Sequence, residues 1–162
     1  MDFVKMVYGW LTFIGNHLQS LLVLVLRLYW GWQFFQTGQG KLKHLDQTAA
    51  YFDSLHLAMP KIQATMAGCV ECFCGLFLLA GLASRMITIP LIVTMCVAYL
   101  AADYPKVANI FNDPNAFVTA NPFLFLLTAV IVFVFGPGKF SVDYLLGWGL
   151  GQPNKAISSH QA

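Results

Sequence analysis

Long apolar runs constrain this chain more than any other feature. Crossing the hydrocarbon core of a bilayer as a helix takes about 20 predominantly apolar residues. Four segments approach that length, namely residues 18–38, 62–83, 86–103 and 117–135. Charged residues make up only 10% of the chain, against about a quarter in a typical soluble domain. We therefore expect an all-α integral membrane protein, a four-helix bundle with short interfacial helices.

The limits of the second run are the clearest. Lys61 and Arg85 bracket it, and the connection to the third run, GLASRM, is so short that these two helices must be antiparallel. The fourth run is ambiguous, because Asn121 and Pro122 resemble a helix cap followed by a proline at the first helical position. Its helix either begins near Ala116 and kinks at the proline, or begins at the proline and is short.

The segments outside the runs predict surface helices and a polar tail. Residues 1–17 carry apolar side chains at spacings of three and four, as a helix in the membrane interface does, with a frayed N-terminus as the alternative. No small-residue cleavage site follows, so we expect the first span to remain in the protein. A short surface helix is expected within residues 45–60. The chain thus divides into an interfacial segment (1–17), a transmembrane domain (18–146) and a flexible polar tail (147–162).

Arg27 and Glu71 are the charges that lie deepest within these runs. If the first span is 18–38, Arg27 lies about 16 Å before its end at Gly38. Glu71 lies about 15 Å into the second helix, counted from Lys61 on the same side. An isolated charge at the bilayer centre costs about 2.5–3.5 kcal/mol, so each seeks a partner. We predict that Arg27 and Glu71 form an ion pair inside the bundle.

Two alternatives to a functional ion pair remain open. If the first span runs upstream through the polar residues at 16–20, Arg27 lies at a helix end and reaches the headgroups beside Tyr29, Trp30 and Trp32. If the pair does form, it either lines a functional cavity or only fixes the register of the two helices.

Small and polar residues share one face of the first two spans, which predicts a cavity near the membrane midplane. Glycines at 31, 38, 68 and 75 would let these helices approach closely. The candidate catalytic residues are Glu71 and Arg27. The candidate ligand-binding residues are Trp30, Gln33, Lys41 and Tyr99, although a simply solvated Lys41 is an alternative.

Other motifs argue against several kinds of site. Cys69 and Cys72 form a CxxC, but they lie in mid-helix, where a thiolate is disfavoured; packing thiols are therefore favoured over electron exchange with a quinone. We find no zinc, haem or nucleotide motif. The nine Lys and Arg residues are dispersed and the net charge is only +2, which argues against nucleic-acid binding.

The blocks LRLYWGWQFFQTGQGKL, GCVECFCGLFLLAGLASRM, PFLFLL and FGPGKFSVDYLL resemble the DoxX family of small four-helix membrane proteins. The resemblance covers about residues 21–146. The positions that match the family pattern are Arg27, Gly31, Phe34, Gly38, Lys41, Glu71, Gly75, Gly81, Gly136, Pro137 and Gly138. The chain departs from that pattern at Cys69 and Cys74, which weakens a family-wide redox role for these thiols.

The resemblance implies a function only in outline. The family is named for the small subunit of an archaeal thiosulfate:quinone oxidoreductase, and other members are linked to complexes that handle thiol or oxidative stress. It implies a multi-pass protein of the plasma (inner) membrane, with both termini in the cytoplasm. We expect a subunit of a quinone-linked redox system that receives electrons from a partner redox subunit, either as a single copy or as a homo-oligomer. The alternative is a non-catalytic scaffold or assembly factor, so whether the chain is itself an enzyme stays open.

Overall fold

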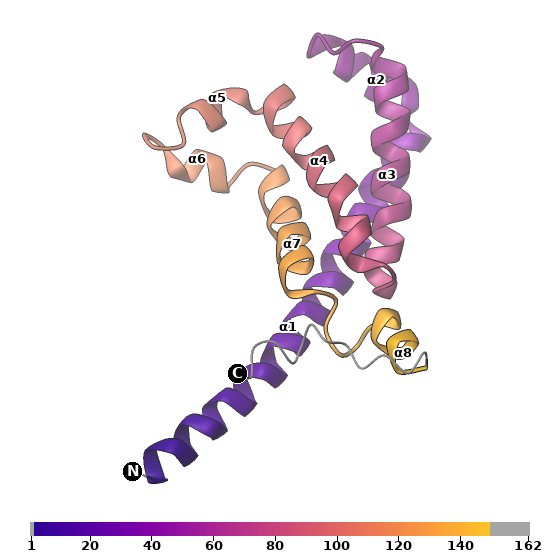
Figure 1. Cartoon of the computed structure of the whole chain (residues 1–162). Coiled ribbons are helices and arrows are strands. Elements are labelled where there is room, and N and C mark those ends of the chain that lie inside the picture. The colour runs from indigo at the N-terminus through magenta and orange to yellow at the C-terminus, as the bar shows by residue number, and fades with distance from the viewer. Residues whose placement is uncertain (1, 150–162) are drawn as a thin grey trace.

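The computed structural model describes residues 2–149, and all regular structure in that part of the chain is helical (Figure 1). The helices are α1 (Asp2–Lys43), α2 (Leu45–Ser54), α3 (Pro60–Ala80), α4 (Ser84–Ala102), α5 (Tyr104–Ala108), α6 (Pro114–Val118), α7 (Pro122–Phe135) and α8 (Val142–Gly149). The predicted all-α class is confirmed.

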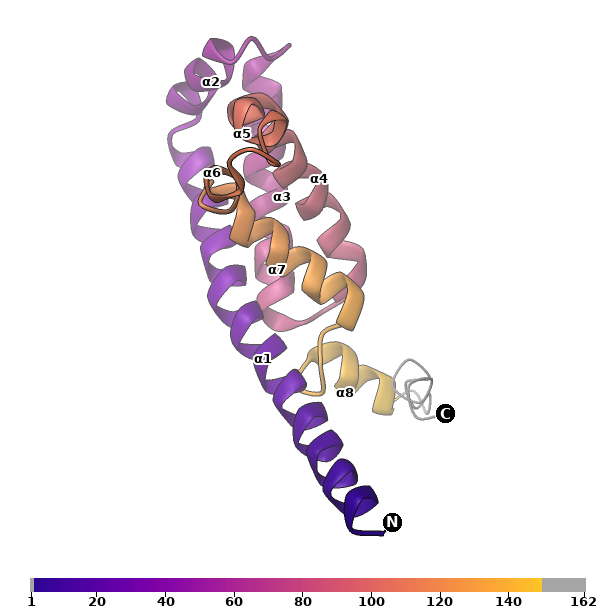
Figure 2. The ribbon, with the colours of Figure 1, turned by 90° about the vertical axis from the view of Figure 1, so that its left-hand side faces the viewer.

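Helices α1, α3, α4 and α7 form the bundle. Helix α1 packs along α3, while α4 packs against both α3 and α7 (Figures 1 and 2). Among the described residues, α1, α3 and α4 are long and apolar enough to cross a membrane, and α7 is a shorter apolar helix of 14 residues. Helices α2, α5 and α6 lie at one end of the bundle and α8 at the other.

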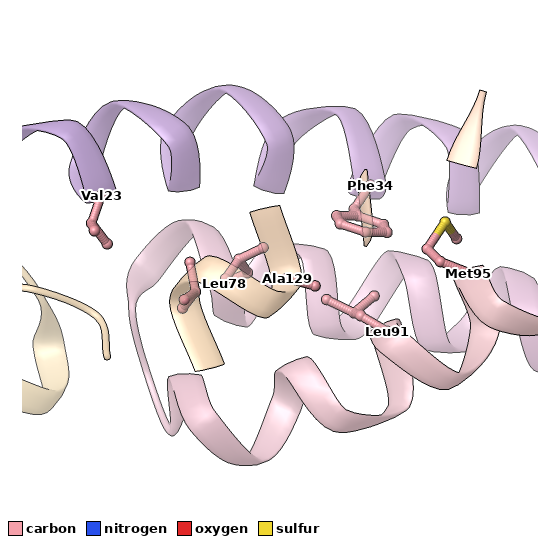
Figure 3. Close-up of a cluster of buried hydrophobic side chains, with 7 residues drawn as sticks. Val23, Phe34, Leu78, Leu91, Met95 and Ala129 are labelled. Carbon is pink, nitrogen blue, oxygen red and sulfur yellow. The ribbon is translucent and has the colours of Figure 1, made fainter. Parts of the chain in front are cut away.

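Apolar side chains from all four helices meet in one core (Figure 3). Its buried members are Val23 and Phe34 from α1, Leu78 from α3, Leu91 and Met95 from α4, and Ala129 and Val132 from α7. Phe34 is fully buried and packs edge-on against Phe125 of α7, with ring centroids 4.7 Å apart. The core therefore joins the first and last helices of the bundle.

Glycines set the register between α1 and α3. A Cβ atom on Gly38 would lie 2.7 Å from the carbonyl oxygen of Gly68, and one on Gly31 would lie 3.1 Å from the carbonyl oxygen of Gly75. The two backbones are therefore in direct contact, as small residues allow between membrane helices. Gly38 lies level with residues 68–72 of α3, and Gly31 lies level with residues 75–79.

The expected end of the first helix at Gly38 is wrong. Helix α1 is continuous from Asp2 to Lys43, without a boundary near residue 17 and without a stop at Gly38. Polar residues near the expected boundary bond within the helix: the Thr12 hydroxyl donates to the carbonyl of Tyr8 at 2.8 Å. A glycine in a helix costs about 1 kcal/mol relative to alanine, and close packing against α3 outweighs that cost at Gly38.

The other boundaries agree better with the sequence. Helix α7 begins at Pro122 after a separate α6, so the short form of the fourth helix is confirmed. The short helix expected within residues 45–60 is α2. Residues 147–149 of the expected tail belong to α8, and the rest of the tail lies outside the described residues. An interfacial position for residues 1–17 stays a prediction.

Candidate functional site

Arg27 does not pair with Glu71, so the predicted ion pair is wrong. The Arg27 residue is 1% exposed, and its guanidinium donates to four backbone carbonyl groups. Nε donates to Leu78 at 3.0 Å and Nη2 donates to Leu79 at 3.3 Å, both in the last turn of α3. Nη1 donates to Phe140 at 3.3 Å and also to Pro137, both in the connection between α7 and α8.

These carbonyl groups explain why an arginine is buried here. The last carbonyls of a helix have no partner within the helix, and they form the negative end of its dipole. Gly81, with φ +72°, closes α3 in the left-handed conformation, and its N–H donates to Leu78 at 3.1 Å. Arg27 supplies further donors and a positive charge. A Cβ atom on Gly81 would lie 2.5 Å from Cζ of Arg27, so the glycine also makes room for the guanidinium.

Asp143 of α8 completes this junction. Its carboxylate accepts hydrogen bonds from the backbone N–H groups of Ala83 at 2.6 Å and Ser84 at 2.9 Å, which caps the start of α4. Its own N–H donates to the carbonyl of Gly81 at 3.0 Å, and its charge acts on Arg27. The sequence analysis missed Asp143, because no local pattern links it to a turn 60 residues earlier. We call Arg27, Gly81 and Asp143 the Arg27 junction.

Glu71 pairs with Lys41 instead. The Lys41 ammonium group donates to Oε2 of Glu71, whose side chain is only 3% exposed, while that of Lys41 is 28% exposed. Glu71 lies about 14 Å from the end of α3 at Ala80 and about 16 Å from its start at Pro60. Helical side chains point toward the N-terminus of their helix, so Lys41 reaches toward the middle of the bundle. The structure thus contains an intramembrane ion pair with a different cation.

Arg27 and Glu71 lie at different depths because Gly38 and Lys61, the expected helix ends from which their depths were counted, are not level with each other. Gly38 in fact lies level with residues 68–72, about nine residues or 13 Å further along α3. Arg27 consequently lies level with the end of α3. This is close to the depth expected in the alternative in which Arg27 lies at a helix end and reaches the headgroups. Its guanidinium is nevertheless buried against carbonyl groups rather than directed to the headgroups.

The other candidate ligand-binding residues lie on α1 and α4. Trp30 packs edge-on against Phe125, with ring centroids 4.8 Å apart, and lies about 16 Å from Lys41 along α1. Tyr99 of α4 is buried, stacks on Phe117, and donates its hydroxyl to the carbonyl of Phe117 at 2.9 Å. Gln33 is half-buried on α1. A shared ligand site for these residues stays a prediction.

The cysteines show no arrangement for metal binding. All four are free thiols; Cys69, Cys72 and Cys74 lie half-buried on α3, and Cys96 is exposed on α4. Within residues 2–149, no group of three or more His, Cys, Asp or Glu side chains could hold a metal ion. The backbone of Cys72 packs against Gly38; a packing role for the thiols stays a prediction.

A comparison with known families shows to which family the chain belongs. The model of the DoxX family matches residues 22–103, just over half of the chain. The chain belongs to the DoxX family. The matched region of this DoxX protein contains Arg27 and the ion pair of Lys41 and Glu71, but it ends before Asp143. Its apolar helices and its family make it a membrane protein. No curated protein and no solved structure matches the chain.

Proposed function

We propose that this DoxX protein is a non-catalytic membrane scaffold or assembly subunit whose buried charges hold its bundle together. One observation carries the proposal: both charges buried in the described bundle are compensated within the chain. Arg27 is bound by four backbone carbonyls, and Glu71 is bound by Lys41. A charge compensated within the chain can stay buried without a ligand, whereas an uncompensated one would need a substrate or a partner to supply the opposite charge.

The scaffold acts within a larger membrane assembly. We place the protein in the plasma (inner) membrane with both termini in the cytoplasm, and we assign a redox subunit as its partner, as the family resemblance implies. The apolar outer faces of the bundle helices contact lipid, this partner or a second copy. Under this proposal the ion pair of Lys41 and Glu71 matters for assembly only through the stability of the bundle.

A double replacement tests the proposal. Lys41→Met together with Glu71→Leu removes both charges and keeps similar side-chain volumes. A scaffold should retain its partner in complexes purified from the native membrane, although each single replacement destabilises the protein. The exposed ion pair of Lys61 and Asp46, 3.0 Å apart, supplies a control, since its removal should change neither stability nor assembly. A double variant that folds but no longer holds its partner would contradict a purely structural pair.

The second candidate is a subunit of a quinone-linked redox system, with Lys41 as the contact. Lys41 is 28% exposed beside a buried carboxylate, and its ammonium group has three donors, of which Glu71 takes one. A quinone carbonyl could accept another, while the partner subunit supplies the electrons. In this case Glu71→Gln should weaken quinone binding by the purified protein, and the double replacement should abolish it without loss of fold. Unchanged quinone affinity in both variants would contradict this second candidate and favour the scaffold function.

A further inference from the structure

The N-terminal part of α1 extends past the bundle. We call residues 5–19 the arm; in Figures 1 and 2 this indigo segment extends beyond α8 and clear of the other helices. Helix α1 has 42 residues and is therefore about 63 Å long. Residues 20–43 alone extend about 36 Å, which already exceeds a hydrocarbon core of about 30 Å. The arm thus lies beyond the membrane-spanning part of α1.

The arm is apolar although nothing in the described chain covers it. Seven of its apolar side chains are between 39% and 72% exposed, namely Met6, Val7, Tyr8, Trp10, Leu11, Phe13 and Leu18, and Ile14 is half-buried. At about 100° per residue, these positions occupy an arc of roughly 220° around the helix, which also contains one polar side chain, the exposed His17. The remaining narrow stripe contains Lys5, Gly9, Thr12 and Gln19. Because Lys5 is the only Lys, Arg, Asp or Glu in the arm, water is a poor solvent for this helix.

We propose that the arm lies on the bilayer, with its apolar arc in the boundary between headgroups and acyl chains. A partner helix covers a stripe of only about 100°, so a second copy of the arm would leave half of the arc in water. Acyl chains can cover the whole arc. An amphipathic helix of this kind inserts about 5–10 Å into the boundary region.

The faces of α1 agree with this position. The polar stripe of the arm lies on the side of α1 that turns Val23, Arg27 and Phe34 into the bundle. The apolar arc continues the opposite side, where Leu21, Leu22 and Val25 are exposed. A bend toward that lipid-facing side brings the arc onto the acyl chains and turns the polar stripe to water.

Gly15 gives the helix a weak point for this bend. A Cβ atom there would meet nothing within 4 Å, so no packing holds the backbone straight. Glycine lacks the Cβ atom that restricts the backbone angles of other residues, so the helix bends more easily there. Because the arm carries a single lysine, its affinity comes from apolar area rather than from anionic lipid, and vesicles of phosphatidylcholine should suffice.

Quenching of Trp10 fluorescence by brominated lipid tests the position of the arm. The full-length protein with Trp30, Trp32 and Trp148 replaced by Phe is reconstituted into phosphatidylcholine vesicles brominated either near the headgroups or near the chain ends. We expect Trp10 to lose about half or more of its emission with bromine near the headgroups, and less with bromine near the chain ends. The difference in fluorescence between the native chain and its Trp10→Phe variant gives the signal of Trp10 without the triple replacement.

The controls separate lipid from the other occupants. Moving the tryptophan to the polar stripe, as Trp10→Phe with Thr12→Trp, should reverse the result: weak quenching by brominated lipid and strong quenching by aqueous acrylamide. Strong acrylamide quenching of Trp10 itself would overturn the proposal. Protection of Trp10 from both quenchers would also overturn it. If this protection persists when the protein is diluted about tenfold in lipid, Trp10 is buried in protein; if it disappears, a second copy covers the arm.

Discussion

Replacing Lys41 with methionine would leave the Glu71 carboxylate buried without its cation. The Glu71 side chain is 3% exposed and lies near the middle of α3. Removing one partner of a buried ion pair costs about 3–5 kcal/mol in soluble proteins. Since 28% of the Lys41 side chain is exposed, headgroups and water weaken the pair. We therefore expect Lys41→Met to lower the free energy of unfolding by about 3 kcal/mol, the lower end of that range.

A double-mutant cycle separates this pair from the one that the sequence suggested. Lys41→Met with Glu71→Leu should recover most of the loss, giving a coupling energy of about 2 kcal/mol. Arg27 bonds to the carbonyls of Leu78 and Leu79, about 11 Å along α3 from Glu71. Effects at sites this far apart usually add within about 0.5 kcal/mol, so Arg27→Met and Glu71→Leu should be additive.

Reversible unfolding by SDS in mixed micelles, followed by circular dichroism, measures both cycles on the same protein. The cycle of Lys61→Met and Asp46→Leu, at an exposed ion pair, serves as the reference, with an expected coupling below about 1 kcal/mol. A larger coupling between Arg27 and Glu71 than between Lys41 and Glu71 would refute the register derived from the glycine contacts.

Further predictions concern the helix contacts and the Arg27 junction. Gly38→Ala places a Cβ atom 2.7 Å from the carbonyl oxygen of Gly68 and should destabilise the protein by about 1–3 kcal/mol in SDS titrations. Gly40→Ala meets nothing within 4 Å and should be neutral or stabilising by up to about 1 kcal/mol. Asp143→Ala removes the cap of α4 and should cost about 1–2 kcal/mol by the same measurement. Arg27→Lys replaces a planar fork by a point charge and should speed hydrogen exchange in the turn between α3 and α4; unchanged exchange would contradict the assigned contacts.

The helix limits that the sequence predicted well depend on local signals. Lys61 and Arg85 bracket α3 and its turn, and Pro122 begins α7, because charges and prolines act on their own segment of backbone. The end of α1 was predicted badly for the same reason. Gly38 is locally a stop signal, but its contact with a distant part of α3 makes it part of the helix interior.

Predicting the partner of Glu71 requires the register between α1 and α3, and counting residues from the helix ends does not give that register. The sequence analysis recognised the small residues at 31, 38, 68 and 75, yet it did not align them. Placing Gly38 opposite residues 68–72 puts Lys41 one turn beyond Glu71, within reach of a long side chain. The glycine stripe was therefore the signal that could have identified the pair of Lys41 and Glu71.

The partners of a buried cation cannot always be found from the sequence, and Arg27 is an example. Its acceptors are the backbone carbonyls of Leu78, Leu79, Pro137 and Phe140, and any residue type at these positions provides the same oxygen atom. What selects them is the exposed end of α3 and a turn that carries two glycines with positive φ, Gly136 and Gly138. A search for an opposite charge at matching depth therefore misses the partner of an arginine that binds a helix end. Glu71 differs, because a buried carboxylate in mid-helix finds the backbone N–H groups around it already bonded and needs a cationic side chain; once the glycine contacts fix the register, Lys41 is that cation.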